Sequence, residues 1–91
     1  MNIGSLGEWL VLYKLDHGWD LLLGKAACWL EQKYSRLYGG RTVEVISPFL
    51  VLRLLDSNLI LFQPYKDEPY ALGHCRLTEK GKEAYLENYS Q

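Results

Sequence analysis

The 91-residue sequence lacks most of the features that would assign it to a specialised class of protein. Its two cysteines, Cys28 and Cys75, cannot build a disulfide framework and fall short of a zinc quartet, so we interpret them as buried thiols. Apolar runs stay well below the roughly 18 to 20 residues that a membrane-spanning helix needs, and the N-terminus lacks the basic start of a signal peptide. These absences predict a cytoplasmic protein with no membrane segment, no metal and no cofactor.

A charge excess of one sign is also lacking, because 10 Lys and Arg residues face 11 Asp and Glu residues. This balance disfavours a protein that simply coats nucleic acid, since that mode of binding needs a strongly basic surface. Apolar and aromatic residues make up 48% of the chain, enough to offset the ordering entropy by burial, which excludes a disordered chain. A chain this short builds one core, so we expect a single domain over residues 1–91.

Groups that could carry out catalysis are too few for an enzyme. His17 and His74 lie far apart in the sequence, and neither a glycine-rich phosphate loop nor a Gly-x-Ser-x-Gly motif occurs. We therefore expect no catalytic residues. An aromatic-lined ligand pocket is an alternative, although a place in the core is favoured for its candidate residues. These are Trp9, Tyr13, Trp19 and Trp29.

The first helix is predicted over residues 6–16, between a Ser5/Glu8 capping box and a stop at His17-Gly18. It is apolar on two sides, and such a helix needs two partners. One partner is the core of the domain. The other is either more of the same core or a second subunit, and a homodimer is the expectation. The residues assigned to that dimer interface are Val11, Leu12, Leu15, Tyr85 and Tyr89.

Residues 19–38 have few helix breakers after Gly24, and apolar residues recur there at helical spacing, which predicts a second helix. Trp29 would lie on its exposed side among cations. Residues 25–41 contain four cations and one carboxylate, a local charge of 4 − 1 = +3 and the most basic stretch of the chain. This stretch is either a contact surface or a solvated face in which Lys stems cover the indole.

A third helix is predicted from Ser47-Pro48 to Ser57, where Ser47 is the N-cap, Pro48 is the first helical residue and Asn58 takes the left-handed conformation at the end. A short extended segment, residues 42–45, precedes it. With its aliphatic stripe in the core, this helix exposes a second stripe to solvent. The second stripe consists of Phe49, Leu52, Arg53 and Asp56.

The rest of the chain changes to a period of two, which is typical of a β-hairpin. Its strands are expected over residues 59–63 and 70–77, joined by a polar turn. Thr78 then caps a final helix over residues 79–87.

This order of elements resembles the winged helix-turn-helix fold, and short motifs are similar to those of PadR-like and MarR-like regulators. His17-Gly18-Trp19-Asp20 looks like the tetrapeptide that follows the first helix of PadR-like proteins, and Leu77-Thr78-Glu79-Lys80-Gly81 matches the return of the wing in both families. The resemblance implies an α+β winged helix-turn-helix with three helices, a two-stranded wing and a short C-terminal helix. It also implies a transcriptional regulator that binds duplex DNA.

Two functions are therefore weighed. The first is DNA binding, for which the candidate contacts are Lys25, Lys33, Arg36, Arg41, Ser47, Arg53, Lys66 and Arg76. The second is a protein-binding winged helix, either an adaptor subunit or a small phage or plasmid inhibitor of a host complex, whose added interface residues are Trp29, Phe49 and Leu52. The resemblance makes DNA binding the first expectation and protein binding the alternative. The exposed stripe of the third helix speaks for the alternative, because only Arg53 is a good reader of base edges.

Overall fold

A computed structural model describes residues 6–33, 41–67 and 69–89. Within these ranges the chain forms three helices and five strands. The helices are α1 (Leu6–Asp16), α2 (Pro48–Asp56) and α3 (Glu79–Tyr89). The strands are β1 (Asp20–Leu23), β2 (Cys28–Lys33), β3 (Arg41–Ile46), β4 (Ile60–Pro64) and β5 (Gly73–Leu77).

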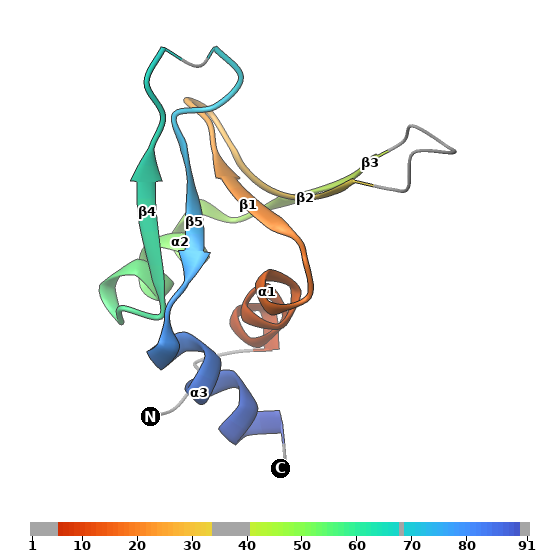
Figure 1. Ribbon diagram of the computed structural model, residues 1–91, viewed down its shortest axis with the longest axis vertical. Coiled ribbons are helices and arrows are strands. Elements are labelled where there is room, and N and C mark those ends of the chain that lie inside the picture. The colour runs from red at the N-terminus through yellow and green to blue at the C-terminus, as the bar shows by residue number, and fades with distance from the viewer. Residues whose placement is uncertain (1–5, 34–40, 68, 90–91) are drawn as a thin grey trace.

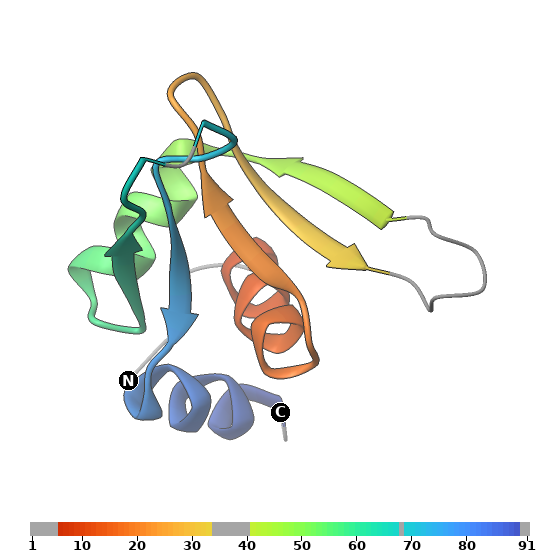
Figure 2. The ribbon, with the colours of Figure 1, turned by 45° about the horizontal axis from the view of Figure 1, so that its top comes forward.

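The five strands form one antiparallel sheet in the order β3-β2-β1-β5-β4. Two hairpins link β1, β2 and β3, whereas α2 carries the chain from the edge strand β3 to the opposite edge strand β4 (Figure 1). The turned view in Figure 2 shows α1 and α2 behind the strands and α3 beyond the end of β5. The molecule therefore has a helix-covered sheet face and an open sheet face.

The core lies between the helices and one face of the sheet. Leu21 of β1 is paired with Leu30 of β2 on one side and with Cys75 of β5 on the other, so the three side chains share a face. All three are nearly inaccessible to solvent, and Leu12 of α1 and Leu54 of α2 pack on the same cluster. Burial of this row is what fixes the central strands in register.

The winged helix-turn-helix prediction is wrong. Residues 20–33 of the predicted second helix form the hairpin of β1 and β2, and the remaining residues 34–38 lie outside the described part of the chain. The turn lies at Gly24, whose backbone N–H donates to the carbonyl of Ala27 at 2.8 Å. The element that precedes α2 is the strand β3, so the described residues contain no helix-turn-helix. The two predicted wing strands are members of a five-stranded sheet.

The other predicted elements are confirmed. Gly18 ends α1 with a φ of +90°, Ser47 caps α2 in an extended conformation, and Asn58 adopts a φ of +59° after α2. The strands of the second hairpin and the final helix also lie where the sequence places them, apart from shifts of a few residues at their ends. Local signals of this kind are caps and turn residues, which act without tertiary partners.

The start of α3 is held against the start of β4. The Thr78 hydroxyl accepts a hydrogen bond from the backbone N–H of Gly81 at 3.0 Å, as expected for a cap, and contacts the carbonyl of Leu59 at 3.0 Å. A Cβ atom on Gly81 would lie 2.1 Å from that same carbonyl oxygen. Gly81 is therefore required by the close approach of two backbones.

Candidate functional site

The outer face of α2 is the most exposed apolar surface on any helix that the structure describes. Phe49 is 77% exposed and Leu52 is 54% exposed, and they lie one turn apart. Val51 and Leu54 point the opposite way, into the core. The exposed stripe predicted from the sequence is confirmed, and it comprises Phe49, Leu52, Arg53 and Asp56.

The position of Phe49 is set by the start of the helix. The Ser47 side chain accepts a hydrogen bond from the Phe49 backbone N–H at 3.2 Å, and Pro48 occupies the first helical position. Both features make the first turn of α2 rigid, because the cap satisfies a free donor and the proline ring fixes φ. The Phe49 ring is thus presented to solvent from an ordered backbone.

An ion pair ties the middle of this face to α1. Arg53 Nε lies 3.0 Å from Glu8 Oε1, and the Glu8 side chain is only 6% exposed while that of Arg53 is 66% exposed. A buried carboxylate is costly without a charged partner, so this contact fixes α1 and α2 relative to each other. Arg53 therefore has a structural role at the place where the sequence suggested a reader of base edges.

A groove lies beside the exposed face of α2, between α1 and the junction of β3 with α2. Leu10 stands on its α1 side and Leu50 on its α2 side. Lys14 and Glu44 also line it and form an ion pair with each other. The groove is therefore shared by α1, β3 and the first turn of α2, and no residue of the exposed stripe lines it.

Of the remaining candidate DNA contacts whose side chains are described, two lie in neighbouring loops at one end of the sheet and the third lies on its open face. Lys25 lies in the turn after β1 and Lys66 in the turn after β4, whereas the exposed Arg76 alternates with the buried Cys75 and so faces the open side of the sheet. Lys33 and Arg41 are paired in the ladder of β2 and β3, but their side chains lie outside the described part, as does Arg36.

Three of the candidate dimer-interface residues are part of the core instead. Val11 and Leu12 are 3% and 0% exposed, and Tyr85 is 2% exposed. Leu15 is partly buried and packs against the same cluster. The second apolar side of α1 is therefore covered within the chain, because α3 packs on α1. A dimer interface was expected there instead. The Tyr89 side chain lies outside the described residues.

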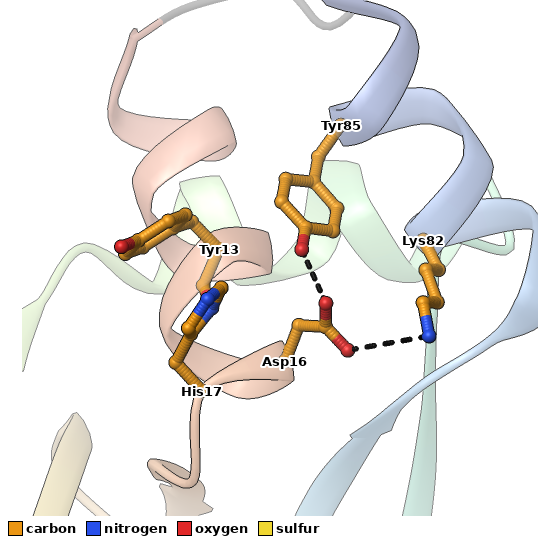
Figure 3. A network of polar contacts seen from close by, with 5 residues as sticks. All are labelled: Tyr13, Asp16, His17, Lys82 and Tyr85. Atoms are coloured by element: carbon orange, nitrogen blue, oxygen red, sulfur yellow. Dashed lines mark hydrogen bonds and ion pairs between the residues drawn. The ribbon is translucent and has the colours of Figure 1, made fainter. Parts of the chain in front are cut away.

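The junction of α1 and α3 is a network of polar contacts and stacked rings (Figure 3). The Tyr85 hydroxyl donates to the Asp16 carboxylate, and the Lys82 Nζ atom lies 3.9 Å from Asp16 Oδ1. Tyr13 stacks on His17 with ring centroids 4.1 Å apart. Burial, followed by the hydrogen bond to Asp16, raises the pKa of Tyr85 to about 12, so the phenol stays protonated. The network is a structural link between the helices.

An aromatic cluster on the open sheet face was missed in the sequence. Tyr70 packs edge-on against Trp29 with centroids 5.5 Å apart, and its hydroxyl donates to Glu31 Oε1 at 2.7 Å. Glu31 is 4% exposed as a result of this cover. The signal was the alternation within β2, which places Trp29 and Glu31 on one face and Leu30 on the other.

The described residues contain no candidate metal site, and their two cysteines are unreactive. No group of three His, Cys, Asp or Glu side chains in the described ranges could hold an ion. Burial raises the pKa of Cys28, and burial together with Cys28 raises that of Cys75 to about 11, so both are inert thiols. The His74 ring lies tilted against Tyr65 with centroids 5.2 Å apart, and its buried Nδ1 has no hydrogen-bond partner among the described residues.

Comparisons of the chain with protein-family models, with curated proteins and with solved structures gave no match. Over the ranges that the structure covers, no helix combines the length and apolar character needed to cross a membrane. The fold and surface therefore define a class only: a small α+β protein with a five-stranded antiparallel sheet and an exposed apolar helix face.

Proposed function

We propose that this chain is a protein-binding module and that its partner docks on the outer face of α2. The observation that carries the proposal is the exposure of Phe49 and Leu52, at 77% and 54%, on an ordered and capped helix. Fully burying such a side chain is worth about 1.5 to 3 kcal/mol, so a partner that covers both gains a large contribution. Two exposed apolar anchors one turn apart are typical of interface hot spots.

The mode of binding is a helix laid into a groove. A helix that binds in a groove contacts its partner through residues at positions i, i+3, i+4 and i+7. The exposed stripe that begins at Phe49 has this spacing. Asp56, at the C-terminal end of the stripe, supplies a charged rim. The partner is therefore expected to carry an apolar groove bordered by polar groups.

DNA binding stays a prediction that the geometry supports less. Its main support was the resemblance to winged-helix regulators, and the described residues form a five-stranded antiparallel sheet instead of that fold. Arg53 is engaged by Glu8, while Lys25, Lys66 and Arg76 lie on other elements. A duplex needs cations along one continuous surface.

The test is capture of partners from the native source with immobilised protein in three forms. These are the wild type, the double variant Phe49→Ala with Leu52→Ala, and the double variant Leu61→Ala with Leu86→Ala. The third form is a matched control, because Leu61 and Leu86 are 55% and 47% exposed and lie outside α2. A protein retained by the wild type and the control, but lost by the α2 variant, supports the proposal.

A protein lost equally from both variants contradicts docking on α2. Binding to random duplex DNA is measured in parallel across a salt series. DNA binding is favoured instead if the logarithm of the binding constant falls with the logarithm of the salt concentration by about one unit per phosphate contact, and if the α2 variant binds like the wild type.

A further inference from the structure

The edge strand β3 has an outer row of backbone groups whose direction can be derived from the ladder. Gly24 N–H points at Ala27 across the first hairpin, and Leu23 C=O accepts from Leu72 N–H on the other side of β1. Groups on successive residues of a strand point to opposite sides. In the register of β1, β2 and β3, the backbone groups of Glu44 therefore point at β2, whereas Val43 and Val45 direct their N–H and C=O away from the sheet.

The two edges of the sheet differ in how well they are protected. On β4 the same alternation turns Pro64 outward, and a proline has no N–H to offer to a further strand. On β3, residues 42–46 contain neither proline nor lysine, and their one charged residue, Glu44, is paired with Lys14 of α1. Val43 and Val45 are also 46% and 72% exposed beside this edge. An unprotected edge of this kind is a template for another strand.

We propose that a second copy of this chain pairs with this edge, β3 against β3, antiparallel and with Val43 opposite Val43. Symmetric registers that use the outward groups can centre on any residue of β3, and the two with the longest overlap of residues 41–46 centre on Val43 and on Glu44. The alternative register centres on Glu44 and places two carboxylates in a non-hydrogen-bonded pair, where side chains lie closest. The register centred on Val43 places Thr42 opposite Glu44 instead.

The pairing gives one continuous sheet with a two-fold axis perpendicular to it. Both helix layers then lie on one side of the sheet, and Val43 and Val45 of both copies meet on the open side. Val45 is already the neighbour of Trp29 in the ladder, so the joined patch is continuous. The outer face of α2 belongs to the helix layer, and the dimer is independent of the function proposed for that face.

The first test compares sedimentation of the wild type, Val43→Pro and Val43→Thr over a range of concentrations. Proline at residue 43 removes only an outward N–H and leaves the hydrogen bonds to β2 intact, whereas threonine keeps the N–H. We expect a concentration-dependent dimer for the wild type and Val43→Thr. For Val43→Pro we expect the dimer dissociation constant to rise by about tenfold or more, in favour of the monomer. The circular dichroism of each variant checks that it is folded.

A charge pair tests the register without a proline. The Val43-centred register places residue 45 opposite Arg41 of the second copy. Val45→Lys should therefore weaken the dimer, while Val45→Glu should keep or strengthen it. In the register centred on Glu44, residue 45 lies opposite Val43, and the two variants should behave alike.

Spin labels on Val43→Cys and Leu61→Cys supply the distance test, because the native thiols of Cys28 and Cys75 are buried. Labels at residue 43 should lie within about 20 Å of each other, since paired strands are about 4.8 Å apart. Labels at residue 61, nine strand spacings apart, should lie up to about 43 Å apart. A monomer at high concentration, or a dimer with distant labels at residue 43, overturns the proposal. A dimer lost only on Phe49→Ala also overturns it and points to α2 instead.

Discussion

The helices α1 and α2 are both apolar on two sides, yet the fold treats them differently. In α1, Val11 and Leu12 are buried, because the helix packs on α3, on α2 and on the sheet. In α2, whose neighbours are α1 and β4, Val51 is buried while Phe49 is left in solvent. A second apolar side on a helix therefore predicts an external partner only where the chain supplies no internal one.

The position of each helix explains the contrast. Helix α1 lies between the sheet and α3, so its sides are covered except near Leu6 and Leu10. Helix α2 lies at the side of the molecule as the connection between the two edge strands (Figures 1 and 2). The sequence of either helix alone does not show whether its second apolar side is covered by the rest of the chain.

The largest expected effect separates the two helices by stability. Leu12→Ala removes a fully buried side chain of α1 and should lower the free energy of unfolding by about 3 kcal/mol. Leu52→Ala on the outer face of α2 should change it by less than about 0.5 kcal/mol. Denaturant titration of both variants measures the difference. Equal losses would show that Leu52 is also part of the core.

A smaller effect is expected at the contact between the two helices. Arg53→Ala leaves the buried Glu8 without its ion pair, and we expect a loss of about 1.5 kcal/mol, in the lower part of the range because Arg53 is largely exposed. A double-mutant cycle with Glu8→Gln isolates the pair. A coupling energy near zero would contradict the structural role of Arg53.

The link between α1 and α3 should contribute less. Tyr85→Phe keeps the buried ring but removes the hydrogen bond to Asp16, at a cost of about 1 kcal/mol. The pKa of Tyr85 is raised from 10.0 to about 12, so the folded state holds the proton more tightly than the unfolded state. The stabilisation is therefore complete below pH 10 and is lost as the pH rises towards 12. The alkaline loss of stability measured for the wild type should be smaller in Tyr85→Phe, and an unchanged loss would contradict the assignment.

The smallest effect belongs to the double variant Phe49→Ala with Leu52→Ala. Alanine has the highest helix propensity, which offsets the little packing that these exposed side chains provide. The melting temperature should stay within a few degrees of the wild type. A large decrease would mean that the outer face of α2 is covered by the chain itself.

The part of the fold that could be predicted is the part fixed by local signals. Ser47 with Pro48, Asn58 and Thr78 each act on the backbone within a few residues, and the helices and turns that they define are confirmed. The hairpin of β1 and β2 could not be predicted in this way. Leucine and alanine around Gly24 are good helix formers, and the strands exist because Leu21 pairs with Leu30 and with the distant Cys75.

In the candidate site, too, the residues fixed by local signals could be predicted and those fixed by tertiary contacts could not. The exposed stripe of α2 follows from one helix and its period, so it was predictable and Phe49 and Leu52 lie where expected. The burial of Leu12 and Tyr85 depends on how α1 meets α3, which no local pattern encodes. The cluster of Trp29 and Tyr70 depends on a loop that returns across the sheet from 41 positions further along the chain.

The most direct test of docking on α2 is photo-crosslinking in the native source with p-benzoylphenylalanine in place of Phe49. The same residue in place of Tyr70 is the matched control, since that ring is 44% exposed on the open sheet face. We predict a discrete protein adduct from position 49 that the control does not form. No adduct from position 49, or the same adduct from both positions, would contradict docking on α2.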